Sequence, residues 1–138
     1  MTELLLIILG GAVIAAGLIA VIFKRRPRKL KTVRFQDRWR DLQKLCANKE
    51  TWSKAVVAAD KLLDEALKKR RYAGKSMGER LTKAQRDLSD NEGVWFGHKL
   101  RNKVEHDQDV KLKESEVKKA LIGIRQALKD LGAFPHDK

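Results

Sequence analysis

The sequence has little proline, little cysteine and few aromatic side chains. Proline occurs only as Pro27 and Pro135, and aromatic residues make up 6% of the chain. Because aromatic and β-branched residues favour strands, a chain that is poor in them argues against an all-β fold. The lone Cys46 excludes an internal disulfide and fits a reducing compartment. Ala, Leu, Lys, Glu and Arg dominate instead, which predicts a helical protein.

Charged side chains are also missing from residues 4–23. A helix of this length can cross a hydrocarbon layer of about 30 Å. A dense basic segment follows at once, with Lys24, Arg25, Arg26, Arg28, Lys29 and Lys31. Basic residues on one flank only set the orientation of a span by the positive-inside rule. We therefore expect a single-pass anchor in the cell membrane over residues 1–23, with the N-terminus outside and the rest of the chain in the cytosol.

A secretory signal peptide is the main alternative for this segment. Such peptides carry basic residues before a shorter apolar stretch and small residues at the cleavage site. Here the chain begins with Met1, Thr2 and Glu3, and the apolar run ends in Val21-Ile22-Phe23. These features favour an uncleaved anchor.

The formal net charge of +13 divides into two parts. Residues 24–34, which we call the basic linker, carry seven Lys and Arg residues and no acid. Since Glu3 contributes one negative charge, residues 35–138 keep a net charge of +7. The basic linker is expected to contact anionic lipid headgroups, where each basic residue contributes about 1 kcal/mol. The surplus of residues 35–138 fits a phosphate-rich partner such as RNA, the same leaflet, or solubility alone.

Apolar residues recur at helical spacing in five stretches behind the basic linker. The stretches cover residues 35–46, 48–71, 76–88, 92–106 and 117–131. Asn48, Ser76 with Glu79, and the segment 89–91 are expected N-caps, whereas Gly74 and Gly132 are expected C-terminal stops. No strand pattern occurs, so we expect an all-α chain in which residues 35–138 form one antiparallel bundle of four or five helices.

The sequence also predicts a loop, the positions of the tryptophans and a close helix contact at two glycines. The segment 107–113 is polar and predicts a loop, and the last residues, 133–138, are expected to fray. Trp39, Trp52 and Trp95 each fall on an apolar stripe and are expected in the core. Gly93 and Gly97 are four residues apart and would allow a neighbouring helix to approach closely.

The helix over residues 92–106 concentrates unusual polar side chains. His98, Arg101, Asn102 and Glu105 fall at i, i+3, i+4 and i+7, which places them on one side, away from the apolar stripe of Phe96, Leu100 and Val104. His106 follows one residue on. Structural roles account for each of these residues separately: an Arg101–Glu105 ion pair, packing of His98 beside Trp95, and a favourable helix-end position for His106.

The segment Arg101-Asn102-Lys103-Val104-Glu105-His106 resembles the R-x(4–6)-H motif of the HEPN superfamily, in which Asn often follows the Arg. The resemblance covers these six residues directly. It implies an all-α bundle, pairing of two protomers, and a metal-independent ribonuclease. By the resemblance, His106 would transfer a proton at the ribose 2′-hydroxyl or the leaving oxygen, Arg101 would hold the phosphate, and Asn102 would orient its neighbours. His98 and Glu105 would support them.

Two functional classes follow from the sequence. In the first class the chain is a membrane-tethered binding or adaptor module that binds an unidentified protein, a nucleic acid or the leaflet itself. This class requires less specific residues, so we rank it first. A membrane-tethered HEPN-like ribonuclease is the alternative. No metal and no cofactor are expected, because His98, Glu105, His106, Asp107 and Asp109 show no recognised ligand spacing.

Overall fold

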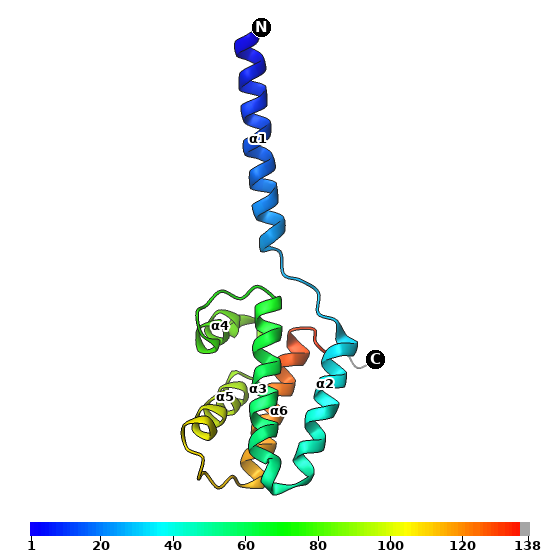
Figure 1. Ribbon diagram of the computed structural model, residues 1–138, viewed down its shortest axis with the longest axis vertical. Coiled ribbons are helices and arrows are strands. Elements are labelled where there is room, and N and C mark those ends of the chain that lie inside the picture. Colours follow the sequence, from blue (N-terminus) through cyan, green and yellow to red (C-terminus); the bar gives the residue numbers. More distant parts are fainter. Residues whose placement is uncertain (136–138) are drawn as a thin grey trace.

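The structure is a computed structural model that describes residues 1–135, apart from the Arg25 side chain. This part of the chain contains six α-helices and no strand, so the predicted all-helical class is confirmed (Figure 1). The α-helices are α1 (Thr2–Arg25), α2 (Thr32–Lys44), α3 (Trp52–Lys69), α4 (Met77–Ala84), α5 (Asn91–His106) and α6 (Glu114–Asp130). Short 3₁₀ helices are η1 (Leu45–Ala47), η2 (Lys49–Thr51) and η3 (Gln85–Asp87).

Helix α1 stands apart from the other helices as an isolated stem (Figure 1). Its segment Thr2–Lys24, 23 residues long, is long and apolar enough to cross a membrane, and none of it is buried inside the protein. At 1.5 Å per residue it spans about 35 Å. The apolar side chains of α1 are therefore free to contact a surrounding apolar medium.

Helix α3 is the centre of the packed helices, and we call residues 30–135 the helical domain. The buried side of α3 contacts α2, α5 and α6, and it includes Val56, Ala59, Leu63 and Ala66. Apolar burial of this kind contributes about 25 cal/mol for each Å² removed from water.

The three tryptophans have different positions relative to this core. Trp39 is buried, as expected. Trp52 and Trp95 are only partly buried and pack at the edge of the core, so the core expectation is confirmed for Trp39 alone.

Helices α5 and α6 approach each other through glycines. A Cβ atom added to Gly123 would lie 2.2 Å from the Gly93 backbone, and one added to Gly97 would lie 2.9 Å from Ile124. Side chains at these positions would hold the helices apart. The close approach expected at Gly93 and Gly97 is therefore confirmed.

Of the three N-caps expected from the sequence, the structure confirms two. The Ser76 hydroxyl accepts a hydrogen bond from the Glu79 backbone N–H at 3.2 Å, and the Asp90 carboxylate accepts one from Gly93 at 2.9 Å. Asn48 makes no side-chain cap, so this expectation was wrong. The reason is that α3 begins later, after the 3₁₀ turn η2.

The C-terminal ends of α3 and α6 share one geometry but differ in the residue that makes the turn. Gly132, with φ 83°, follows α6, and its N–H and that of Ala133 bond back to Lys129 and Leu128. After α3 the same position is occupied by Arg71, with φ 67°. Gly74 therefore does not end α3, because the Arg71 and Tyr72 N–H groups already bond back to Lys68 and Leu67.

Both ends of the helical domain are fastened to its core. Leu30 of the basic linker is 8% exposed, and the Arg28 N–H donates to the Lys69 carbonyl at 3.2 Å. Near the other end Ala133 and Phe134 are buried, and the Phe134 ring packs edge-on against Trp39. The expected fraying was thus wrong for these two residues, because Phe134 fills the core. His136 and residues 137–138 lie outside the described part.

Candidate functional site

Asp60 of α3 is a carboxylate in the interior of the helical domain. It is 1% exposed, and its two oxygens lie 3.1 and 3.3 Å from Nδ1 of His98 on α5. Nε of Arg101, one turn further along α5, lies 3.6 Å from Asp60 Oδ2. A buried carboxylate requires such partners, since leaving it unpaired would cost several kcal/mol.

Arg101 is held on a second side by residues of its own helix. Its side chain is 24% exposed, its Nη2 lies 3.3 Å from Glu105 Oε2, and its Nη1 donates to Asn102 Oδ1 at 3.1 Å. The expected Arg101–Glu105 ion pair is therefore confirmed. The guanidinium lies between two carboxylates, so this group has no surplus positive charge for a phosphate in a single chain.

His98 is buried rather than on an outward polar stripe. The inward side of α5 consists of Gly93, Val94, Gly97, His98 and Leu100. This side is rotated from the expected stripe because Gly97 must face α6. The His98 ring also packs edge-on against Trp95, with 5.8 Å between ring centroids, as the structural interpretation expected.

His106 is separate from this polar group. It is exposed and is the last residue of α5. Five residues along a helix correspond to a rotation of roughly 140°, so Arg101 and His106 point in different directions. Among the described residues, no hydrogen bond or ion pair joins His106 to Arg101, Asn102 or Glu105.

Asp60 did not emerge from sequence reasoning, although a signal was present. Val56, Ala59, Asp60 and Leu63 fall at i, i+3, i+4 and i+7, so the carboxylate lies on the core-facing stripe of α3. An acid on such a stripe indicates a buried polar contact.

Metal and nucleophilic chemistry find little support in the described residues. Within residues 1–135, no three His, Cys, Asp or Glu side chains gather closely enough to hold a metal ion. Burial raises the pKa of the Cys46 thiol above its ordinary value, which keeps the thiol protonated at neutral pH.

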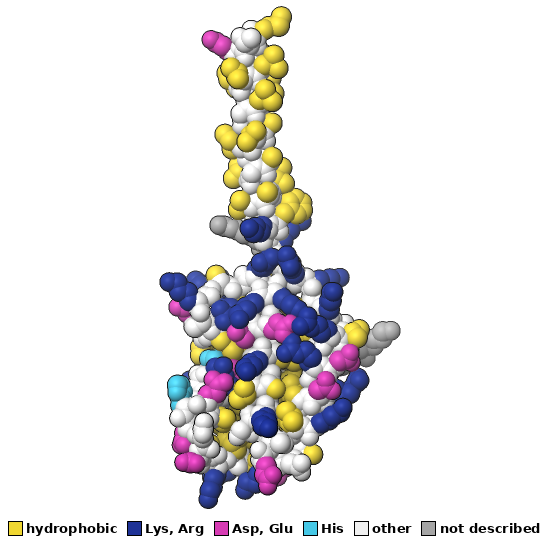
Figure 2. Space-filling view, in the orientation of Figure 1, with side chains coloured by type: hydrophobic (Ala, Val, Ile, Leu, Met, Phe, Trp, Pro, Cys, Tyr) yellow, Lys and Arg dark blue, Asp and Glu magenta, His cyan; other side chains and the backbone are white. Residues whose placement is uncertain are grey.

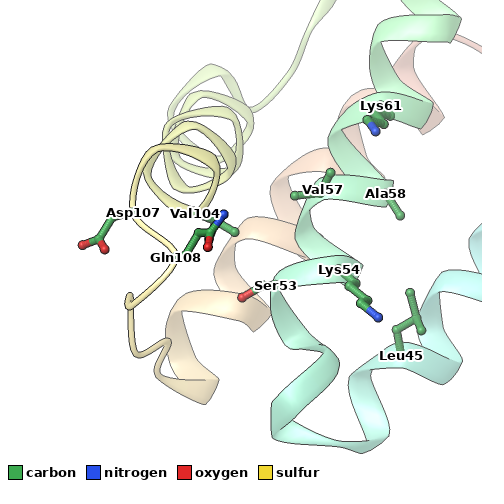
Figure 3. A pocket seen from close by; sticks show the side chains of 9 residues that line it. All are labelled: Leu45, Ser53, Lys54, Val57, Ala58, Lys61, Val104, Asp107 and Gln108. Carbon is green, nitrogen blue, oxygen red and sulfur yellow. The ribbon is translucent and has the colours of Figure 1, made fainter.

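A second candidate site is an apolar groove on the outer face of α3 (Figure 3). Its volume is about 700 Å³. Lys54, Val57, Ala58 and Lys61 line it from α3, with Leu45 of η1 on one side and Val104 and Gln108 on the other. Figure 3 shows Val57 directed toward the end of α5 and Lys54 toward Leu45, while Asp107 points away. We call this surface the α3 groove.

The two lysines of the α3 groove are exposed and have no ion-pair partner among the described residues. By contrast, Asp64 and Glu65, in the next turn of α3, are paired. Burial would raise the pKa of Asp64, but hydrogen bonds and charges from Arg80 and Lys68 lower it below its ordinary value. Arg38 and Lys69 lower the pKa of Glu65 in the same way, against burial. No carboxylate of α3 is thus free to neutralise Lys54 or Lys61.

Comparisons with known proteins add no assignment to either site. The chain matches no protein-family model, no curated protein and no solved structure.

Proposed function

We propose that this chain is a single-pass membrane protein whose helical domain is a binding module on the cytosolic side. The length and apolar surface of α1 and the basic linker at its C-terminal end support this orientation. In this proposal residues 35–138 form an antiparallel bundle, and one face of it receives a protein partner.

The α3 groove carries the proposal. Its apolar floor of Val57, Ala58 and Val104 lies between the free amines of Lys54 and Lys61. This combination suits a short amphipathic helix with two or three apolar anchors and acidic residues on its flank, because each lysine then gains a charged partner. Such a small contact favours reversible binding.

Peptide binding to the full chain in phosphatidylcholine nanodiscs tests this function. Two helical peptides share one apolar face, one with glutamates beside it and the other with lysines. We expect saturable binding of the glutamate peptide by fluorescence anisotropy and at least about ten-fold weaker binding of the lysine peptide. Binding should weaken in Lys54→Glu/Lys61→Glu, which reverses the rim charge.

The matched control is Lys49→Glu/Lys111→Glu, which changes the same charge at two exposed positions outside the groove. It should bind the glutamate peptide like the parent chain. Equal binding of the two peptides, or equal loss in both double variants, would contradict a binding site in the α3 groove.

A HEPN-like ribonuclease is the second candidate. What favours it is the fixed position of Arg101, held by Asp60, Asn102 and Glu105 on one face of α5. Because His106 points elsewhere, the proposal requires a homodimer in which His106 of one protomer approaches Arg101 of the other.

Incubation of the full chain with structured and single-stranded RNA in EDTA tests this candidate. Cleavage should disappear in Arg101→Ala and in His106→Ala, and persist in the control Arg86→Ala. Absence of cleavage by a folded, dimeric parent chain would remove it for those substrates.

A further inference from the structure

The basic residues of the chain are concentrated in two segments without acids. The basic linker carries seven Lys and Arg residues, and residues 68–75 carry five: Lys68, Lys69, Arg70, Arg71 and Lys75. Together they account for twelve of the thirteen net positive charges. The rest of the chain is therefore nearly neutral, and the surplus of residues 35–138 is not dispersed.

The fold brings these two segments together. The Arg28 N–H donates to the Lys69 carbonyl at 3.2 Å, which fastens the basic linker to the end of α3. Leu30 inserts into the core beside this contact. The C-terminal end of α3 consequently faces α1 (Figure 1), and Lys and Arg side chains gather on the domain beneath the stem (Figure 2).

Several of these cations have no ion-pair partner among the described residues. Lys68 pairs with Asp64, and both Lys69 and Arg34 of the basic linker pair with Glu65. Arg28, Arg71 and Lys75 are exposed and form no side-chain ion pair with any described residue. Their charges are available to an anionic surface.

Arg71 also has an unfavourable backbone conformation. Its φ of 67° lies in the left-handed region, which costs a non-glycine residue stability. Gly132 occupies the equivalent position after α6. The chain thus has an arginine at a turn where glycine would be the more stable choice.

We infer that the C-terminal end of α3 and the basic linker form one docking face that lies flat on an anionic membrane leaflet. The inference rests on the proposed anchoring by α1. Only Arg26 and Pro27 separate the last residue of α1 from Arg28, so the Arg28 edge of this face lies within about 10 Å of the end of α1. That distance is about one Debye length at physiological salt, so lipid headgroups are the nearest anions outside the protein.

Lysine acylation of the full chain in nanodiscs, read by mass spectrometry, tests this docking. One bilayer is phosphatidylcholine alone, and the other contains about one-third phosphatidylglycerol. We expect acylation of Lys68 and Lys75 to slow at least about five-fold in the anionic bilayer. Each basic residue near such a surface gains about 1 kcal/mol of attraction, which corresponds to roughly a five-fold shift toward the lipid-bound amine. Lys49 and Lys111, at the end away from α1, should react equally in both bilayers, and high salt should abolish the difference.

The variant Arg28→Gln/Arg71→Gly removes one charge from each segment and no side-chain ion pair among the described residues. It should restore part of the reactivity of Lys75, because two of the twelve cations are removed, while its thermal midpoint stays equal or rises because glycine suits the turn. The control Lys49→Gln/Lys111→Gln removes the same charge at the end of the domain away from α1. In this control Lys75 should remain protected from acylation in the anionic bilayer.

Equal reactivity of Lys75 in both bilayers would overturn the docking face. Protection of Lys75 by added RNA in the neutral bilayer, without protection by the anionic lipid, would assign the face to RNA and overturn it equally. Failure of the chain to co-purify with neutral nanodiscs is a separate outcome, since it would contradict anchoring by α1 and the proposed function itself.

Discussion

At the scale of single residues, Asp60 joins two helices. His98 and Arg101 of α5 both lie against this carboxylate of α3, and all three side chains are wholly or largely removed from water. The pairing holds Arg101 against the core, while Glu105 and Asn102 hold it from its own helix. Asp60 is therefore one of three side chains that position Arg101.

Replacement of Asp60 by alanine should lower the free energy of unfolding by about 3 kcal/mol, because His98 loses its buried hydrogen-bond partner and Arg101 loses a buried counter-charge. Denaturation of the full chain by urea, followed by tryptophan fluorescence, measures it, since α1 has no tryptophan. The control Asp41→Ala breaks an exposed pair with Lys44 and should cost less than about 0.5 kcal/mol. Similar losses in both variants would contradict the role of Asp60.

Sequence spacing predicted the Arg101–Glu105 pair of this site but not the contact between Asp60 and His98. Arg101 and Glu105 are one helical turn apart, so their contact follows from helix geometry. Asp60 and His98 are 38 residues apart, and their contact depends on how α3 and α5 pack. That packing in turn depends on Gly97, whose contact with α6 determines which side of α5 is buried.

At the scale of elements, the close packing of α5 against α6 requires glycine, which has no side chain. A methyl group on Gly123 would overlap the Gly93 backbone, which has no flexible end that can move aside. A methyl group on Gly78 of α4 would approach the Trp95 ring no closer than 3.7 Å. Alanine at Gly123 and alanine at Gly78 therefore compare the same substitution at a crowded and at an open helical position.

The Gly123→Ala variant should lose about 3 kcal/mol or more of stability, because overpacking must push α5 and α6 apart. The Gly78→Ala variant should be neutral or gain up to about 1 kcal/mol from helix propensity. Thermal unfolding of both variants by tryptophan fluorescence measures the difference. A Gly123→Ala variant as stable as the parent would contradict the close α5–α6 approach.

Acid should weaken the contacts that α3 makes with α2 and α4. The pKa values of Asp64 and Glu65 lie below their ordinary values of 3.8 and 4.5, so both carboxylates are more easily ionised in the folded chain. Their stabilisation is complete above these ordinary values and is lost as the pH falls through the lowered ones. We therefore expect a constant midpoint of urea unfolding down to about pH 5 and a decline below about pH 4.

The double variant Asp64→Asn/Glu65→Gln is the matched test of this pH dependence. It should be less stable at neutral pH, and its midpoint should decline less steeply in acid. An unchanged acid decline would mean that other carboxylates cause it.

The helices themselves could be predicted from apolar periodicity, but their ends could not all be predicted. Caps at Ser76 and within residues 89–91 follow from capping preference, and the structure confirms them at Ser76 and Asp90. Arg71 could not be foreseen as the turn after α3, because propensity assigns left-handed turns to glycine. The hydrogen bonds of the surrounding backbone override that preference.

At the scale of the whole molecule, the stem, the basic docking face and the α3 groove follow one another along the chain's long axis. Helix α1 lies at one end, and the turn between α2 and α3, where the α3 groove begins, lies at the other (Figure 1). A domain docked through the end of α3 would thus present its groove away from the leaflet. The sequence predicts the span and its basic flank, but only the fold shows that residues 68–75 join the basic linker.

The most direct test of this account is the sidedness of the full chain in intact cells. Thr2→Cys and Lys111→Cys are made separately in a Cys46→Ser background, and the cells are treated with a membrane-impermeant maleimide. We expect labelling of the cysteine at position 2 in intact cells, and of the cysteine at position 111 only after the membrane is permeabilised. Labelling at position 111 in intact cells would contradict it.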